Sequence, residues 1–199
     1  MLVEGIKSRP VYAPLEPRPG TLHLIVADGE GAQAVLDLAA IASPGFFDRA
    51  RVIFVPRDAA GRFEGPLEQL HAESLYVGPT VPAVLPRLRQ ELATAKMGTQ
   101  LYLAGTEGLI GQAMQVALES GIDHGSVQKE HRGSEVRRVQ CVHCKGITEE
   151  VRTQPVQCSH CGLMLLVRDH YSRRIGAFQG VCIDAEQPGT AADPEEAFL

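Results

Sequence analysis

Two pairs of cysteines carry the clearest chemical signal in this 199-residue sequence. Cys141 and Cys144 form the first Cys-x-x-Cys pair, and Cys158 and Cys161 form the second, with residues 145–157 between them. Each pair places two thiolates on one tight turn, and two such turns that face each other supply the four sulfur ligands of a tetrahedral metal site. We therefore predict that these four cysteines bind one metal ion.

The identity of the metal stays open at this point, because four thiolates suit both zinc and iron. We favour zinc; iron is the alternative, and it would make the module a rubredoxin-like electron carrier. The module has too few residues to bury a core of its own, so we expect the metal to hold it together. His143 and His160, inside the two pairs, are expected at the surface rather than as ligands. The fifth cysteine, Cys182, lies in an apolar stretch and is expected to be a small buried side chain.

A dense polar cluster follows the second cysteine pair. It forms either a polar hairpin corner or a surface that docks onto a partner protein, and its candidate docking residues are Arg168, His170, Tyr171, Arg173 and Arg174. Residues 129–180 contain nine Lys/Arg and five Asp/Glu, a local charge of +4; the whole chain carries −5, so the remainder carries −9. Because arginine and tyrosine are frequent interface anchors, we favour the docking surface.

Upstream of this module, short apolar strands alternate with helical patterns. Strands are predicted at 22–27, 51–55, 75–77, 101–104 and near 126–128, and helices at 32–42, 80–97 and 106–119. This alternation indicates an α/β fold with a doubly wound parallel sheet over residues 21–133. A small β module of the zinc-ribbon or rubredoxin type is expected over residues 134–186. The proline-rich residues 1–20 are expected to form an extended arm, and residues 187–199 a flexible tail.

Two of the predicted strand-to-helix turns contain residues that suit a bound phosphate. Gly29 and Gly31 lie in the first turn, and Gly105 and Thr106 lie in the second. A glycine lets the backbone approach a phosphate, and a helix N-terminus adds positive potential. The same turns contain acidic residues and no Lys/Arg, so plain tight turns are the competing interpretation. We expect the binding of NAD(P)H to be weak or absent.

Composition argues against several classes of function. No apolar run approaches the roughly 20 residues that span a bilayer, so no membrane helix is predicted. The first residues lack an apolar signal core, which favours a cytoplasmic location. The absence of tryptophan and an aromatic content of 5% argue against a nucleic-acid binder. No catalytic constellation, haem-ligand motif, flavin site or ferredoxin cysteine spacing is recognisable, so we expect no catalytic residues in this chain.

Residues 20–131 resemble the pyridine-nucleotide domain of the ferredoxin reductase family. The similarity rests on Leu24-Ile-Val-Ala-Asp-Gly-Glu-Gly-Ala32, a strand with a glycine-rich turn, and on Leu101-Tyr-Leu-Ala-Gly-Thr-Glu-Gly-Leu-Ile-Gly-Gln-Ala113. Gly121-Ile-Asp123 and Val127-Gln-Lys-Glu130 are similar to that family's last turn and strand. Ala104 and Thr106 stand where the family has cysteine and proline. The resemblance implies a reductase-like scaffold.

The C-terminal module resembles the C-terminal domain of a family of accessory subunits of dimethylamine monooxygenase. The resemblance rests on the two Cys-x-His-Cys pairs and on the run Val167-Arg-Asp-His-Tyr-Ser-Arg-Arg-Ile-Gly-Ala-Phe-Gln-Gly-Val181. The reductase-like N-terminal half fits the same family. The resemblance implies an oxidative N-demethylase that uses NADPH and O2 to convert dimethylamine to methylamine and formaldehyde.

The same resemblance implies two kinds of partner subunit: a haem-binding catalytic chain, and a reductase that carries FMN and a [2Fe–2S] cluster. This chain would then be an accessory subunit that organises or couples those subunits in a bacterial cytoplasm. One alternative is an electron-transfer subunit that uses a four-cysteine iron site or bound nicotinamide. An alternative of another class is a zinc-ribbon adaptor for nucleic acid, which the acidic first domain and the scarcity of aromatic residues disfavour.

Overall fold

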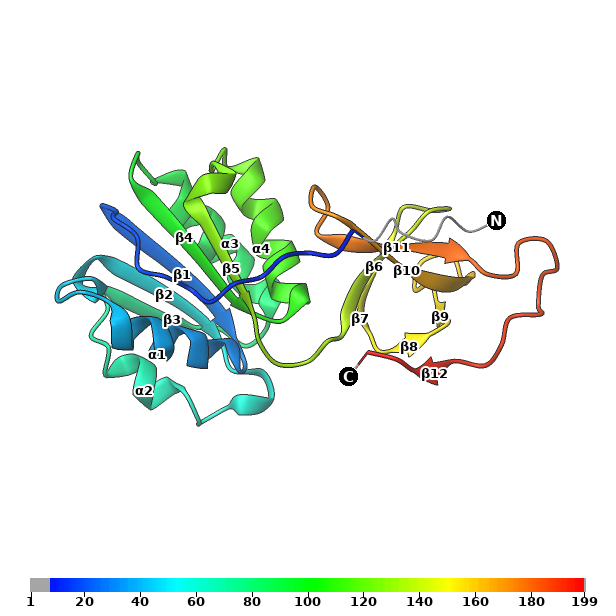
Figure 1. Ribbon diagram of the computed structural model, residues 1–199, viewed down its shortest axis with the longest axis horizontal. Helices are drawn as coiled ribbons and strands as arrows, with labels where there is room; N and C mark the ends of the chain where they lie inside the picture. The colour runs from blue at the N-terminus through cyan, green and yellow to red at the C-terminus, as the bar shows by residue number, and fades with distance from the viewer. Residues whose placement is uncertain (1–7, 199) are drawn as a thin grey trace. The chain divides into compact units, whose positions relative to one another are not determined.

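The computed structural model describes residues 8–198 and divides the chain into two compact units (Figure 1). One unit comprises residues 12–133, and the other comprises residues 134–198 together with residues 8–11. The arm expected over residues 1–20 is thus split between the two units, and residues 1–7 lie outside the described residues. Within residues 8–198, none of the helices has the length and the apolar composition required to cross a membrane.

The unit of residues 12–133 is an α/β domain built on a five-stranded parallel sheet. Its strands are β1 (Leu22–Asp28), β2 (Ala50–Val55), β3 (Ser74–Val77), β4 (Thr99–Gly105) and β5 (Val127–His131). Its α-helices are α1 (Gly31–Ile41), α2 (Glu64–Glu68), α3 (Val81–Ala93) and α4 (Glu107–Glu119). The strand order is β3-β2-β1-β4-β5, and every neighbouring pair is parallel. The doubly wound α/β fold expected from the sequence is confirmed.

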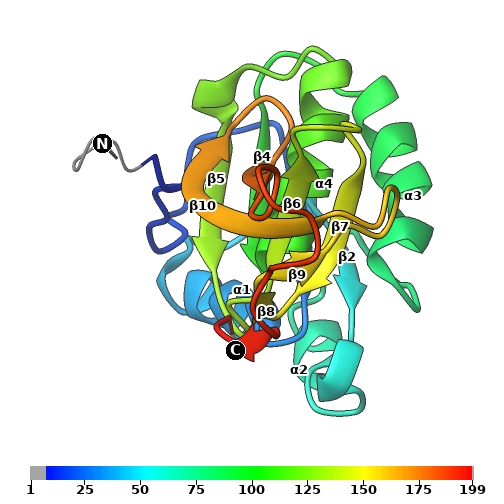
Figure 2. The same ribbon diagram turned by 90° about the vertical axis from the view of Figure 1, so that its right-hand side faces the viewer.

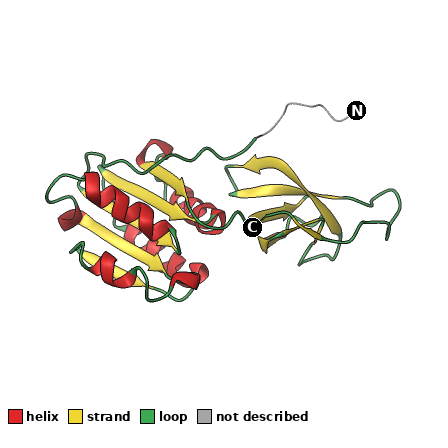
Figure 3. Cartoon of the chain, turned by 60° about the horizontal axis from the view of Figure 1, so that its bottom comes forward, coloured by secondary structure: helices red, strands yellow, loops and turns green. Residues whose placement is uncertain are grey.

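Helices cover both faces of this sheet (Figure 3). α1 and α2 pack on one face, where Phe54 and Tyr102 are the largest fully buried side chains. α3 and α4 pack on the other face, around Leu24, Leu101 and Leu103. Because both faces of a parallel sheet are covered, its central strands are nearly continuous apolar runs in the sequence.

Strands β1 and β4 are neighbours, but the helices that follow them lie on opposite faces of the sheet. α1 follows β1 on one face, and α4 follows β4 on the other. The carboxyl ends of β1 and β4 therefore form the switch point of the sheet, which is the usual ligand crevice of open α/β folds. Thr106 caps α4 at this point, because its hydroxyl oxygen accepts a hydrogen bond from the Leu109 N–H at 3.3 Å.

The arm residues that belong to the α/β domain run along its last strand. The Ala13 N–H donates to the Lys129 carbonyl at 3.2 Å, and the Leu15 N–H donates to Glu130 Oε2 at 2.7 Å. The Leu15 side chain is buried in the core on the α1 face. These contacts cover the edge of β5, which would otherwise offer unpaired backbone groups to another chain.

The second unit is a β ribbon whose two hairpins carry the cysteine pairs. Its strands are β6 (Arg137–Cys141), β7 (Ile147–Val151), β8 (Thr153–Gln154), β9 (Val156–Gln157), β10 (Met164–Ser172), β11 (Ala177–Cys182) and β12 (Glu195–Glu196). Five of them form a sheet in the order β7-β6-β11-β10-β9. Strand β10 is strongly curved (Figure 2), and its pairing with β11 shifts between Arg168 and Tyr171. A bulge of this kind bends a strand and increases its twist.

The last described residues differ from the flexible tail that the sequence predicts. Strand β12 pairs with β8 in an antiparallel two-stranded sheet, and Phe198 is 8% exposed in the ribbon core. The Arg137 guanidinium lies 4.2 Å from the ring centroids of both Phe178 and Phe198. One apolar residue thus anchors a segment whose polar composition, taken alone, predicts mobility.

Candidate metal centre and switch-point crevice

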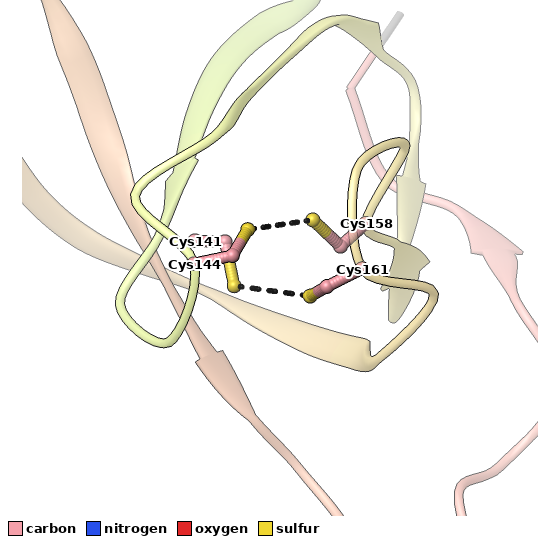
Figure 4. A group of neighbouring side chains, drawn as sticks. All are labelled: Cys141, Cys144, Cys158 and Cys161. Carbon is pink, nitrogen blue, oxygen red and sulfur yellow. Dashed lines mark hydrogen bonds between the residues drawn. The ribbon is translucent and has the colours of Figure 1, made fainter.

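The four paired cysteines converge in the ribbon. The sulfur atoms of Cys141, Cys144, Cys158 and Cys161 all lie within 4.8 Å of one another (Figure 4). Cys141 Sγ lies 3.8 Å from Cys161 Sγ, and Cys144 Sγ lies 3.7 Å from Cys158 Sγ. A tetrahedral site with metal–sulfur bonds of about 2.3 Å has sulfur–sulfur edges of about 3.8 Å. The donor set and its spacing therefore fit one tetrahedral metal ion.

The ribbon sheet brings the two pairs together because β11 lies between β6 and β10. Strand β6 is parallel to β11, and β10 is antiparallel to it. The end of β6, where Cys141 lies, and the start of β10, which follows Cys161, are therefore at the same end of the sheet. Gly180 of β11 permits the close packing between them, since a Cβ there would lie 2.8 Å from Val139 and 2.9 Å from Leu165.

The two cysteine turns share one backbone pattern. In each turn the first cysteine exchanges two backbone hydrogen bonds with residues further along, namely Cys141 with Lys145 and Gly146, and Cys158 with Gly162 and Leu163. Lys145 and Gly162 hold equivalent places, and both have positive φ, 65° and 76°. Gly146, the residue after Lys145, is not among the glycines with positive φ. A Cβ on Gly146 would collide with the His160 ring, so the glycine makes room for that histidine.

The histidine of the second pair joins the two turns at the protein surface. Its Nε2 lies 2.9 Å from the Ile147 carbonyl oxygen of the first hairpin. The adjacent Ser159 N–H donates to Thr148 Oγ1 at 3.2 Å, which adds a second link between the hairpins. Both His143 and His160 are exposed, and neither belongs to the ligand group found within the described residues. The position expected for them from the sequence agrees with the structure.

The pKa values of the cysteine thiols depend on nearby backbone N–H groups and on the other thiols of the cluster. Burial raises the pKa of Cys158, but N–H groups of Cys161 and His160, together with two neighbouring thiols, outweigh it and lower this pKa to about 6. The Leu163 N–H lowers the pKa of Cys161, but burial and three neighbouring thiols raise it to about 12. The Gly146 N–H donates to Cys144 Sγ at 3.4 Å. Four thiolates at this spacing repel one another, and a metal ion would supply the positive charge that stabilises them.

Cys182 is separate from the sulfur cluster. It lies at the end of β11, is partly buried, and its thiol donates to Asp184 Oδ1 at 3.3 Å. Burial and the neighbouring Asp184 carboxylate raise the pKa of this thiol. The sequence predicted a small apolar side chain, whereas the structure places the thiol beside a carboxylate.

The crevice at the switch point is filled by side chains of the α/β domain itself. Asp28, at the end of β1, is fully buried and accepts hydrogen bonds from the Thr106 N–H at 2.8 Å and from the Thr106 hydroxyl at 2.7 Å. The Arg57 guanidinium lies 3.2 Å from the same carboxylate. Burial raises the pKa of Asp28 above its usual value, although Thr106 and Arg57 oppose that rise. The carboxylate thus occupies the N–H and the hydroxyl of the N-cap residue Thr106, two donors that a phosphate bound beside α4 would otherwise use.

The glycines of this crevice allow its two turns to pack together. A Cβ on Gly31 would collide with the Ala104 carbonyl, and a Cβ on Gly105 would collide with the Asp28 carboxylate. Thr106 is 5% exposed, and its hydroxyl is already engaged. The fold therefore brings together all four residues that the sequence suggested for a cofactor, and it arranges them around Asp28: Gly29, Gly31, Gly105 and Thr106.

Two arginines complete this region and were not foreseen from the sequence. Arg57 and Arg62 follow β2 in the chain, and they pair with Asp28 and Glu30 of the first turn. The turns themselves contain no Lys/Arg, so inspection of the turns alone could not find these partners. A usable signal existed, because the carboxyl ends of neighbouring parallel strands meet at one edge of the sheet.

The fold separates the residues that were predicted to dock onto a partner. Four of them are exposed, namely Arg168, His170, Arg173 and Arg174. Tyr171 is partly buried, and its ring packs edge-on against Phe178 with 5.2 Å between the centroids. Tyr171 therefore contributes to the ribbon core and presents little surface to a partner.

Known proteins match both parts of the chain. Residues 4–127 match the family model for the N-terminal domain of dimethylamine monooxygenase subunit DmmA-like proteins, and residues 138–181 match the model for the C-terminal domain of the same proteins. A protein from Ectopseudomonas mendocina (strain ymp), described as the delta subunit of a heme-dependent oxidative N-demethylase, is 33% identical over 138 residues. That match covers 69% of this chain and 78% of the relative.

Among solved structures, this chain is similar to flavohemoglobin from Malassezia yamatoensis with bound FAD and heme. The sequence identity is 16%, and the TM-score is 0.43. The match covers 58% of this chain and 33% of the flavohemoglobin chain, so this chain spans about a third of that protein.

Proposed function

The chain belongs to the dimethylamine monooxygenase subunit DmmA-like family, and from this premise we propose that it is a non-catalytic accessory component of a dimethylamine demethylase. One observation carries the proposal beyond the family: the candidate metal site consists of four protein sulfur atoms. A tetrahedral site with four protein ligands is closed and leaves no position for a substrate or for O2. The metal therefore serves the structure of this chain, and the chemistry takes place in other subunits.

The relative from Ectopseudomonas mendocina supports a role within a multi-subunit enzyme, since it is described as one subunit of a heme-dependent oxidative N-demethylase. We propose that this chain assembles with two partners, a haem-binding catalytic subunit, and a reductase subunit that carries FMN and a [2Fe–2S] cluster. The overall reaction is dimethylamine + NADPH + H+ + O2 giving methylamine + formaldehyde + NADP+ + water. In this scheme the accessory chain organises the two subunits, so that reducing equivalents from NADPH reach the haem.

We propose that zinc is the metal held by Cys141, Cys144, Cys158 and Cys161. Zinc supplies a fixed positive charge without redox chemistry, which is what a ribbon with a small core requires. Rubredoxin-like electron transfer through iron at the same four cysteines is the second candidate. It is favoured by the exposure of Cys144, because an electron carrier needs a sulfur atom near the surface.

Metal analysis and a visible spectrum of the purified chain separate these candidates. We expect one zinc ion per chain and a colourless protein, because zinc has a filled d shell. A red protein whose thiolate-to-iron absorption bleaches on reduction would instead support the electron carrier. This measurement needs no partner subunit, so its outcome is independent of the proposed assembly.

Omission of this chain from the reconstituted enzyme tests the accessory role. We expect formaldehyde formation per NADPH consumed to fall, while the isolated reductase still passes electrons from NADPH to a small artificial acceptor. Full assembly and unchanged formaldehyde yield without this chain would contradict the proposal.

A further inference from the structure

The β10–β11 hairpin ends in a turn that presents two arginines to solvent. Strand β10 ends at Ser172 and β11 begins at Ala177, so residues 173–176 form the turn. Arg173 and Arg174 are both exposed, and we refer to this pair as the arginine tip. The Gly176 N–H donates to the Ser172 carbonyl at 2.8 Å, which closes the turn.

A buried arginine holds the backbone of this turn through a hydrogen bond. Arg138 is 7% exposed, and its guanidinium donates to the Ile175 carbonyl at 2.7 Å. The guanidinium Nε donates to Glu149 Oε1 at 2.8 Å, so two nitrogen atoms of this group are held in place. The turn is therefore ordered before any partner binds, and a pre-organised surface loses less conformational entropy on binding.

The charges of the arginine tip are not neutralised within the described part of the chain. Asp169, the acidic residue of the same cluster, pairs with Arg9 and with Arg137. Among residues 8–198, no ion pair involves Arg168, Arg173 or Arg174. Both guanidinium groups of the tip are thus available for an external anion.

The ribbon as a whole is not basic, and this disfavours nucleic acid as its partner. The structure adds the acidic tail to this unit, and residues 8–11 and 134–198 together contain eight Lys/Arg and nine Asp/Glu, a net charge of 8 − 9 = −1. Binding to a nucleic-acid backbone usually depends on several Lys/Arg–phosphate contacts and, for single strands, on stacked aromatics. The ribbon's buried rings, Phe178 and Phe198, cannot supply such stacking. Paired carboxylates of a protein suit two neighbouring guanidinium forks better, because each fork can bind one carboxylate through two hydrogen bonds.

We propose that the arginine tip binds a carboxylate-rich surface on another subunit of the demethylase. This inference rests on the proposed function, because it takes the partner from the same assembly. The tip supplies two directional contacts on a stiff hairpin, and the metal-bound cysteine turns at the other end of β11 keep the ribbon folded. The structure thereby assigns the ribbon a recognition role in addition to its metal site.

Charge reversal at the tip tests this inference in the reconstituted complex. Binding of the full chain to the haem and reductase subunits is measured for the wild type, Arg173→Glu/Arg174→Glu and Arg173→Lys/Arg174→Lys. We expect the Glu pair to weaken binding by at least about tenfold, because it places like charges in contact. The Lys pair keeps the charge but loses the fork, so an intermediate affinity is expected. A matched pair of single charge reversals serves as the control. Arg173→Glu should weaken binding, whereas Arg152→Glu, at an exposed arginine outside the turn, should bind like the wild type.

The outcomes of this experiment separate the two proposals. If the wild type binds neither subunit, the proposed function fails. If the wild type binds and the Glu pair binds equally well with full metal content, the arginine tip is not the docking surface. A labelled oligonucleotide serves as the competing probe, and binding to it that depends on the tip would overturn the assignment to a carboxylate-rich protein.

Discussion

The sulfur cluster and the switch-point crevice are alike in the sequence and opposite in the structure. Each consists of residues that the sequence marked as a possible binding site, and each brings together two separate segments of the chain. In the cluster, four thiols converge within 4.8 Å of one another, and their charged forms repel. In the crevice, the groups are complementary: Asp28 accepts from Thr106 and pairs with Arg57. A binding site is indicated where like groups gather, and a structural joint where donors meet acceptors.

The same contrast explains why this domain has the crevice typical of nucleotide-binding folds but no open site for a phosphate. The N-terminus of α4 attracts an anion, and Asp28 provides one from within the domain. An internal carboxylate needs no binding from solution, so it occupies the Thr106 N–H and hydroxyl whenever the domain is folded. The crevice thus contributes to the stability of the α/β domain, whereas the cluster depends on an ion from outside.

The largest expected effect comes from removal of one sulfur ligand. Cys158→Ser should release the metal and unfold residues 134–198, because the small ribbon core cannot hold the two cysteine turns together alone. The α/β domain has its own core and should stay folded. Metal content and limited proteolysis check both parts, and a protease-resistant fragment of about residues 12–133 is expected.

Cys182→Ser is the matched control for that change, since Cys182 lies in the same ribbon but outside the sulfur cluster. The control should retain the metal and resist proteolysis. Full metal content in Cys158→Ser would mean that the four cysteines are not the ligand set.

A smaller effect is expected when the internal anion of the crevice is removed. Asp28→Ala removes the acceptor of the buried Thr106 N–H and one charged partner of Arg57, and such a loss in a buried site costs about 2–4 kcal/mol of unfolding free energy. Asp37→Ala is the control, because Asp37 is an exposed carboxylate of α1, and its loss should cost less than about 0.5 kcal/mol. Denaturant unfolding of the α/β domain measures both. Equal costs for the two variants would show that the Asp28 network is not a structural joint.

The smallest effect is expected from addition of nucleotide to the wild type. Because the Asp28 carboxylate already occupies the Thr106 N–H and hydroxyl at the α4 N-cap, NADPH should bind this chain with a Kd weaker than about 1 mM, which corresponds to about −4 kcal/mol. Titration calorimetry at high protein concentration makes the measurement. A micromolar Kd would contradict the view of the crevice as a structural joint and would make it a nucleotide-binding site.

Much of the fold was predictable because local patterns specify it. Each of the five strands of the α/β sheet was anticipated, and α3 and α4 begin within one residue of the predicted helix starts at 80 and 106. Short helix α2 was missed, since five residues carry no clear periodicity. The tail was misjudged for another reason. Its polar composition hides the contribution of Phe198, whose partner Arg137 lies far away in the sequence.

The sequence by itself determined the donor chemistry of the candidate metal centre. Two Cys-x-x-Cys pairs define the donor type, the number of ligands and the geometry that each turn can offer, because these properties depend on neighbours within a few residues. Only the tertiary structure decided the role of the glycine turns. Whether Asp28 leaves an open anion site or closes it depends on where β4 and the segment after β2 end in space, and on the arginine and threonine they bring there. Pairing between distant segments is set by the register of the sheet, and no local pattern of residues records it.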